Sequence, residues 1–136
     1  MSTDQNKQIV RDFYNAIARE DYEAAARCCH EDFVFYLQVD EPIHGVDGFI
    51  GSEKKNFDSF SPFEFSIQQL LAEGDQVAAY MLFDGLHTGN ANGIEPTGNR
   101  VRFSLAMWLT IEDGKIRTKR AHFDSADVHR QLDNAY

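Results

Sequence analysis

Apolar and polar residues alternate along the last third of the chain in two runs, residues 101–111 and 115–124, on either side of Glu112-Asp113-Gly114. Alternation puts every second side chain on one face of a strand. Asp-Gly between two such runs favours a tight hairpin, because both turn residues need positive φ. The pattern therefore predicts a long hairpin over residues 101–124. Its first strand presents one apolar face to a core: Val101, Phe103, Leu105, Met107, Leu109 and Ile111.

The second strand of this hairpin ends on ionisable residues. Arg120, His122 and Asp124 have the same parity as Ile116 and Thr118, which predicts that they share its apolar face. Ionisable groups at the point where an apolar face ends are typical of a pocket opening. We therefore expect Arg120, His122 and Asp124 to lie at the mouth of a cavity.

The N-terminal part of the chain predicts helices before strands. Ser2-x-x-Gln5 is a capping-box pattern, and apolar residues follow it at helical spacing, which predicts a helix over about residues 4–19. Asp21 is the predicted cap of a second, shorter helix. Residues 33–39 are rich in aromatic and β-branched side chains and predict the first strand.

The middle of the chain predicts a third helix and then more strands. Helical spacing over residues 46–57 predicts that helix, with Glu53 on its charged outer face. Strands are expected over residues 63–71 and 76–88, followed by a loop to residue 100. Short turns between neighbouring strands indicate antiparallel pairing, and helices segregated from strands indicate the α+β class. We expect a single domain over residues 1–136, in which a curved, mostly antiparallel sheet wraps around the N-terminal helices as a cone-shaped barrel with one open end.

Composition narrows the possible partners. Of 136 residues, 43% are hydrophobic and 26% are charged, which fits one globular domain. The net charge of −9 argues against nucleic acid and anionic membrane surfaces, which need basic partners, and no apolar run is long enough to cross a membrane. Cys28 and Cys29 are adjacent and cannot easily form an unstrained disulfide. With no signal-peptide core at the N-terminus, we expect a cytoplasmic protein with reduced thiols.

Two residues are candidates for chemistry, and each has a structural alternative. Asp124 is either an acid/base group or the N-cap of a short helix predicted over residues 126–132. His87 has the parity of Met81 and Phe83, so it is either a hydrogen-bonded core histidine or a donor inside a pocket. Trp108 faces away from the predicted core and suits a dimer surface or a pocket wall. Ligand-type residues lack metal-binding spacing, and the glycines lack a phosphate-binding pattern, so we expect neither a metal nor a nucleotide.

Several strings resemble the SnoaL-like polyketide cyclase and ester cyclase family. They are Ile9-Val10-Arg11-Asp12-Phe13-Tyr14, Gly85-Leu86-His87-Thr88-Gly89, Pro96-Thr97-Gly98, and the ending from Gly114-Lys115-Ile116 through Asp124 to Gln131-Leu132. The resemblance covers nearly the whole chain. It implies the cone-shaped α+β barrel of the nuclear transport factor two-like superfamily, no cofactor, and a homodimer formed through the outer sheet. It also implies that Asp124 acts as the acid/base.

The leading hypothesis is a small cofactor-independent enzyme that acts on an apolar or aromatic carbonyl compound. Asp124 would remove a proton α to the carbonyl and His87 would hold the enolate oxygen, giving an intramolecular aldol-type cyclisation or a related enolisation. The residues expected to bind this substrate are His122, Arg120, Trp108, Phe83, Phe35 and Tyr14.

The same fold also carries isomerases, dehydratases, and binding or dimeric interaction domains without catalysis. The non-catalytic alternative is favoured by Met107-Trp108-Leu109-Thr110, which stands where the family has a Gln-x-His pair.

Overall fold

The computed structural model describes residues 2–37, 39–91 and 93–133. The elements, in chain order, are α1 (Thr3–Ala18), α2 (Tyr22–Arg27), β1 (Cys29–Leu37), β2 (Glu41–His44), α3 (Val46–Asp58), β3 (Phe60–Glu73), β4 (Gln76–His87), β5 (Arg100–Glu112), β6 (Lys115–His122) and α4 (Ser125–Asp133). This order confirms the predicted α+β class. None of the helices in the described ranges combines the length and apolarity that a membrane crossing requires.

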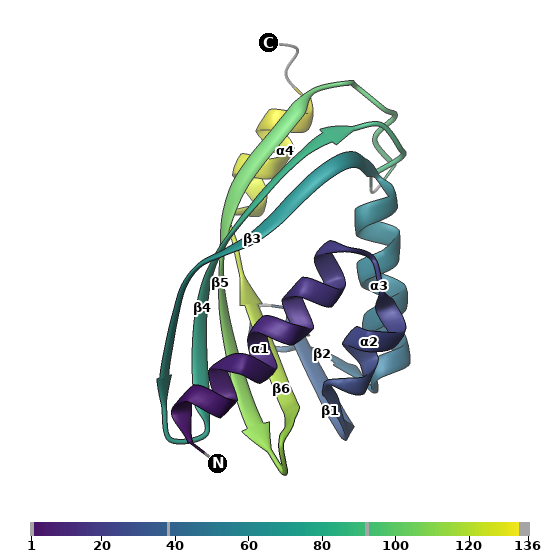
Figure 1. Ribbon diagram of the computed structural model, residues 1–136. Coiled ribbons are helices and arrows are strands. Elements are labelled where there is room, and N and C mark those ends of the chain that lie inside the picture. Colours follow the sequence, from purple (N-terminus) through teal and green to yellow (C-terminus); the bar gives the residue numbers. More distant parts are fainter. Residues whose placement is uncertain (1, 38, 92, 134–136) are drawn as a thin grey trace.

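The six strands form one curved, unclosed sheet in the order β2-β1-β6-β5-β4-β3. Strands β3 to β6 pair antiparallel with their neighbours along the chain. Strand β1 instead pairs parallel with β6, which joins the two halves of the chain. The sheet curves around α1, and α2 and α3 lie on the same side of it (Figure 1). The fold is the cone expected from the sequence.

The core lies between α1 and the concave face of the sheet. The predicted capping box begins α1, and the buried side of this helix includes Val10, Phe13 and Ile17. The predicted apolar face of β5 is buried except for Phe103, which is partly exposed. The hairpin turn is also as predicted, since Asp113 and Gly114 both have positive φ, 53° and 74°.

Strand β6 does not keep a strict alternation. Thr118 pairs with Thr110, but Ile116 pairs with Ile111, so the register shifts between these pairs. A bulge of one extra residue reverses the parity of every side chain beyond it. Arg117 takes up the extra position, and the faces of the strand exchange after it.

The side chains beyond the bulge therefore point the other way from the sequence prediction. Lys119 and Ala121 are buried on the concave side. Arg120 and His122 pair with Trp108 and Ala106, whose side chains are exposed on the convex side. The prediction that Arg120 and His122 share the apolar face of Ile116 is wrong, because that prediction assumed an uninterrupted alternation.

Two strand boundaries also differ from the prediction. Strand β1 begins at Cys29 and ends at Leu37, so Val39 lies beyond it, and Gln38 falls outside the described residues. Strand β3 begins at Phe60, before the Ser61-Pro62 bond, and not at Phe63. A proline is tolerated there because β3 is an edge strand, with no neighbour on one side.

Candidate functional site

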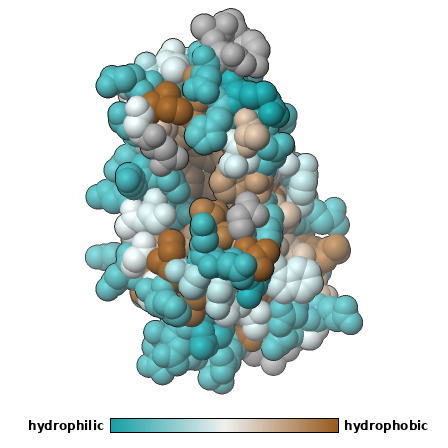
Figure 2. Space-filling model, turned by 180° about the vertical axis from the view of Figure 1, so that it is seen from behind, coloured by the Kyte–Doolittle hydropathy of each residue, from teal (hydrophilic) through white to brown (hydrophobic). Residues whose placement is uncertain are grey.

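A wall of phenylalanine rings covers the concave face of the sheet. Phe83 on β4 lies at its centre, with ring centroids 5.2–6.0 Å from those of its neighbours. The wall comprises Phe57, Phe60, Phe63, Phe65, Phe83, Phe103 and Phe123. Five of these rings are partly exposed, so part of the wall is accessible to solvent. Viewed from behind, the upper half of the molecule has a hollow with hydrophobic side chains at its bottom (Figure 2).

His87 lies at one end of this wall, with its ring centroid 5.7 Å from that of Phe60. It is fully buried, and its Nδ1 lies 2.9 Å from the Thr97 hydroxyl and 3.2 Å from the Thr97 backbone nitrogen. The backbone N–H can only donate, so Nδ1 is an acceptor and a neutral ring carries its proton on Nε2. Nε2 is buried and has no hydrogen-bond partner among the described residues. His87 therefore offers one unused donor to the interior.

Local sequence explains how His87 is held. The loop after β4 folds back on it: the Gly98 N–H donates to the His87 carbonyl, and the His87 N–H donates to the Asn99 carbonyl, each at 2.9 Å. Gly98 has φ +74°, which favours glycine. Gly89 packs against the end of α3, where a Cβ would lie 2.8 Å from the Asp58 carbonyl oxygen. The two glycine-containing strings thus build the support of one histidine.

A second polar group lies deeper in the cone, on β6. The Lys119 side chain is only 2% exposed. Its Nζ lies 4.4 Å from the ring centroid of Phe35, 5.2 Å from that of Phe49 and 5.8 Å from that of Tyr14. No carboxylate in the described part of the chain is close enough to form an ion pair with it. Lys119 is a buried amine surrounded by aromatic rings.

Glu53 and Tyr14 complete this second centre. Burial raises the pKa of the Glu53 carboxyl, and the Lys119 charge only partly opposes that shift. Burial also raises the pKa of Tyr14, whose hydroxyl has no hydrogen-bond partner among the described residues. The pKa of Lys119 is lowered to about 8 by burial, against the attraction of Glu53. Desolvation dominates these shifts, as expected for ionisable groups inside an apolar cone.

The sequence prediction missed two members of this centre. Glu53 was assigned to the outer face of α3 because lysines follow it, and that assignment is wrong. Its position, four residues after Phe49 and four before Phe57, places it on the buried side of the helix, and this spacing was a usable signal. Lys119 had no such signal, because only the bulge in β6 turns it inward. Tyr14, Phe35 and Phe83, predicted to line the pocket, are all buried in the interior.

Asp124 lies just after β6 and is exposed. Its Oδ1 accepts a hydrogen bond of 3.0 Å from the Asp127 backbone N–H, and its carbonyl accepts one from the Val128 N–H. This is the geometry of an N-cap, which was the structural alternative for this residue. The preceding Phe123 belongs to the aromatic wall, with its ring 5.6 Å from Phe103.

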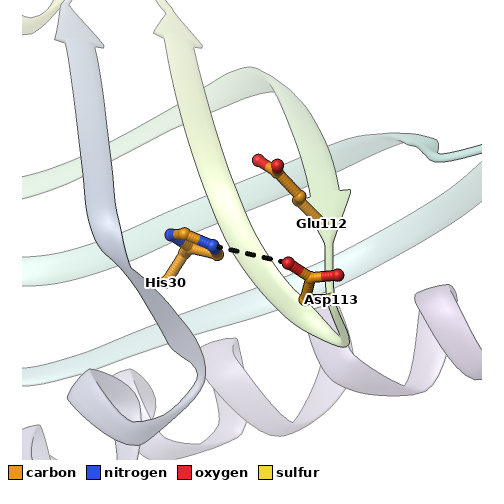
Figure 3. Close-up of side chains that lie close together, drawn as sticks. All are labelled: His30, Glu112 and Asp113. Carbon is orange, nitrogen blue, oxygen red and sulfur yellow. Dashed lines mark ion pairs between the residues drawn. The ribbon is translucent and has the colours of Figure 1, made fainter.

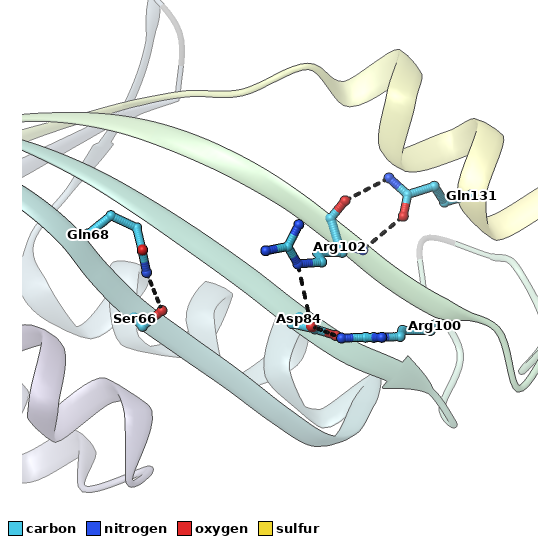
Figure 4. Close-up of polar contacts among 6 residues, drawn as sticks. All are labelled: Ser66, Gln68, Asp84, Arg100, Arg102 and Gln131. Carbon is cyan, nitrogen blue, oxygen red and sulfur yellow. Dashed lines mark hydrogen bonds and ion pairs between the residues drawn. The ribbon is translucent and has the colours of Figure 1, made fainter.

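The helix that Asp124 caps is fixed to β5 by one glutamine. The Gln131 side chain accepts from the Arg102 N–H at 2.8 Å and donates to the Arg102 carbonyl at 2.9 Å (Figure 4). These are the backbone groups that a neighbouring strand would satisfy, and β6 has already ended at this level. On the same strand, Arg100 and Arg102 both pair with Asp84, and the hydrogen bond from Arg100 lowers the pKa of Asp84. Gln131 thus positions α4 over the end of the cone.

The convex face of the sheet carries an apolar surface. Leu71, Tyr80 and Trp108 are 61%, 50% and 51% exposed. They border a shallow hollow of about 500 Å³, which Arg120 and His122 also line. Arg120 stacks on Tyr36, with its guanidinium carbon 4.0 Å from the ring centroid. The predicted binding residues Trp108, Arg120 and His122 therefore gather on the outer face, apart from Tyr14, Phe35 and Phe83.

A small cluster of ligand-type side chains lies at the opposite end of the sheet from α4. His30 Nε2 is 3.9 Å from Asp113, and Glu112 is nearby (Figure 3). His30 Nδ1 accepts from the Asp32 N–H, so the neutral ring presents an N–H and not a lone pair to Asp113. Glu112 pairs with Arg117 at 3.3 Å. Each of the three side chains therefore has a polar partner at 3.3–3.9 Å. The two cysteines are free thiols, and burial raises the pKa of Cys29 to about 12.

Comparison with known proteins identifies a family. The family described as SnoaL-like polyketide cyclase matches residues 8–132. No curated protein sequence matches the chain significantly. Among solved structures, a candidate SnoaL-like polyketide cyclase from Jannaschia sp. CCS1 superposes with a TM-score of 0.90 at 18% identity, over 98% of this chain and 95% of the other.

Two further solved structures carry other names on a similar fold. AclR, a candidate hydroxylase from Streptomyces galilaeus, has a TM-score of 0.87 at 22% identity, over 96% of this chain and 97% of its own. An epoxide hydrolase from M. tuberculosis, described as LEH-like, has a TM-score of 0.75 at 22% identity, over 96% of this chain and 90% of its own. At these identities the likeness establishes the fold, and the chemistry must be argued from the side chains.

Proposed function

The chain belongs to the SnoaL-like polyketide cyclase family, and on that premise we propose that it is a cofactor-independent enzyme that enolises an apolar or aromatic carbonyl compound. Enolisation followed by attack on a second carbonyl of the same substrate gives an aldol-type cyclisation. The observation that carries this proposal is the buried His87 Nε2, which has no partner among the described residues and lies at the end of the aromatic wall.

His87 is suited to hold an oxygen atom that gains negative charge. Its Nδ1 is fixed as an acceptor by Thr97, so the neutral ring aims a single N–H into an apolar interior. A donor fixed before reaction stabilises an enolate oxygen more strongly in such surroundings than it would in water. The same donor would bind the ground-state carbonyl and orient its α-carbon.

Asp124 is the proposed acid/base. It lies next to Phe123 of the wall and beyond His122, the last paired residue of β6, so strand alternation does not fix its direction, and only its Oδ1 is engaged in capping α4. Its carboxylate would take the α-proton and return it to the alkoxide that forms on ring closure. These steps only transfer a proton to and from Asp124 and form one carbon–carbon bond, so they need no oxidant, reductant or metal. Proton transfer by a positioned carboxylate accelerates such reactions by ~10²-fold or more.

Proton exchange tests this proposal without knowledge of the natural substrate. With 1-tetralone as an aromatic ketone in D₂O, NMR follows the replacement of α-protons by deuterium. We expect Asp124→Asn to reduce catalysed exchange by ~10²-fold while it leaves the melting temperature nearly unchanged, because Asn caps about as well as Asp. Asp124→Ala should also lose ~1 kcal/mol of stability, because alanine cannot cap. His87→Ala should slow exchange in protein that still folds.

A binding protein without catalysis is the second candidate. It is favoured by the exposure of Asp124 and by its engagement as an N-cap. In that case wild type and Asp124→Asn give the same exchange rate, equal to that of buffer, although 1-tetralone still binds. That result would overturn the enzyme proposal.

We also propose that the chain forms homodimers through the convex face of its sheet. The exposed Leu71, Tyr80 and Trp108 make an apolar surface of the kind that marks an interface, and a self-complementary contact would cover both copies. Light scattering at micromolar concentration should give twice the chain mass for wild type. Trp108→Glu should give the monomer mass with an unchanged far-UV circular dichroism spectrum. A monomeric wild type would contradict this proposal.

A further inference from the structure

We propose that Lys119 and Tyr14 form a carboxylate-binding subsite inside the cone, so that the ligand is an aromatic compound with an acidic group. This inference adds a ligand class to the proposed function but rests only on binding, and not on turnover. It starts from two buried hydrogen-bond donors on neighbouring side chains, neither of which has an acceptor among the described residues.

The first donor is the Lys119 ammonium. It is buried on β6 against the faces of Phe35, Phe49 and Tyr14, and those faces offer a cation weak attraction but no hydrogen bonds. A buried ammonium without hydrogen bonds to a counter-ion is costly. Methionine would fill the same space without that cost, so the amine is a local departure from core packing of the kind expected at functional sites.

The second donor is the Tyr14 hydroxyl on α1. It is buried and has no partner in the part of the chain that the structure describes. The Lys119 Nζ lies over the ring of this tyrosine, 5.8 Å from its centroid, so the ammonium and the tyrosine are neighbours although they come from different elements. A carboxylate has two oxygens and accepts from both an ammonium and a hydroxyl. One carboxylate could therefore supply an acceptor to each of these two donors.

The groups that face Lys119 do not already supply such an acceptor. They are Glu53 from α3, Cys29 from β1 and Tyr14 from α1. Glu53 is the natural counter-ion, but it forms no ion pair with Lys119 among the described contacts, and burial shifts its pKa upward, which favours the neutral acid. Burial likewise keeps the Cys29 thiol neutral, since its pKa is about 12. The Lys119 charge therefore lacks a close partner of opposite sign.

Ring contacts connect this subsite to His87. Successive centroids from His87 to Phe60, Phe83, Phe65 and Tyr14 are 5.7, 5.2, 6.0 and 5.8 Å apart. The apolar wall thus has an N–H donor at one end and the ammonium and hydroxyl at the other. A ligand with a carbonyl at His87 and a carboxylate at Lys119 would have to extend along this wall.

Binding of 2-naphthoate and of its neutral analogue 2-naphthamide tests the inference by calorimetry at pH 7. Wild type should prefer the carboxylate by at least ~10-fold, the scale of a charge-assisted hydrogen bond. Lys119→Met should abolish the preference, and Tyr14→Phe should reduce it by several-fold. Glu53→Gln, which has nearly the shape of the neutral acid, should leave the preference for naphthoate in place, because burial already favours the uncharged form of Glu53. Arg120→Met, which removes the neighbouring cation on the outer face, is the matched control and should change nothing.

The pH dependence gives a second readout. Naphthoate affinity should fall as pH rises through about 8, where Lys119 loses its proton, while naphthamide affinity stays level. Equal binding of the two compounds by wild type, no binding of either, or a preference that survives Lys119→Met would each overturn the subsite. These outcomes are independent of the 1-tetralone exchange result, so failure of the enzyme proposal and failure of the subsite can be told apart.

Discussion

Lys119 and Arg120 are neighbouring cations on one strand, and each lies over aromatic rings. Arg120 stacks on Tyr36 on the convex side, partly exposed, and donates to the Val39 carbonyl at 3.4 Å. Lys119 lies under three rings on the concave side, with a pKa lowered to about 8. Both cations contact the face of an aromatic ring, but only Arg120 is also in contact with water.

The difference shows that ring faces do not replace water for a buried amine. A cation–π contact contributes about 0.5–1 kcal/mol at an exposed site. Removing an ammonium from water costs several kcal/mol. At the partly exposed Arg120 the contact adds a small gain to a solvated charge. At Lys119 desolvation exceeds the attraction of three rings and of Glu53, and the neutral amine gains population.

The largest expected effect follows from this imbalance. Lys119→Met should stabilise the fold by ~3 kcal/mol at pH 7, from a pKa that falls from 10.5 to about 8 at 1.36 kcal/mol per pKa unit. Arg120→Met should change stability by ~1 kcal/mol or less. Urea unfolding of both variants measures the contrast. A Lys119→Met protein that is less stable than wild type would show that the ammonium has a partner.

The stability difference between Lys119→Met and wild type should become smaller as pH rises. Below pH 8 the amine is charged in the folded and unfolded states, so the full cost is present. Between pH 8 and 10.5 the folded protein has released the proton and the unfolded chain still holds it, so stability rises with pH from this group. Wild type should therefore approach Lys119→Met in stability over this window, and the comparison cancels the other titrating groups.

A smaller effect is expected for the tyrosines on the two sides of the sheet. Tyr14→Phe removes a buried hydroxyl without a described partner and should stabilise the free protein by ~1–2 kcal/mol. Tyr36→Phe removes a hydroxyl from a partly exposed ring and should be neutral. Thermal unfolding in ligand-free buffer compares the two. A loss of stability in Tyr14→Phe would mean that the hydroxyl is hydrogen-bonded.

The smallest effect concerns the outer stack itself. Tyr36→Leu should lower stability by about 0.5–1 kcal/mol through loss of the cation–π contact. A double-mutant cycle with Arg120→Met isolates this coupling. A coupling free energy near zero would mean that the contact between Arg120 and Tyr36 contributes nothing to stability. A coupling of several kcal/mol would indicate that the convex face is buried, as in the proposed dimer.

The sequence by itself determined most of the elements and two members of the wall, Phe83 and Phe103. Period-2 alternation in residues 101–111, the Asp113-Gly114 turn and the capping box at Ser2 are local patterns, and local backbone physics is sufficient to express them. The same patterns placed Phe83 and His87 on one face of β4, since no bulge interrupts that strand between them. Asp124 was recognisable as a possible cap for the same local reason.

Only the tertiary structure decided which chemistry faces inward. A single extra residue at the bulge in β6 moved Arg120 and His122 to the convex side and turned Lys119 into the core. The parallel pairing of β1 with β6 and the packing of α3 then placed Phe35 and Phe49 around its amine. A bulge has a weak sequence signature, and it is selected by how the whole sheet curves. For that reason the buried amine could not be predicted from the sequence, although the inward faces of β4 and β5 could.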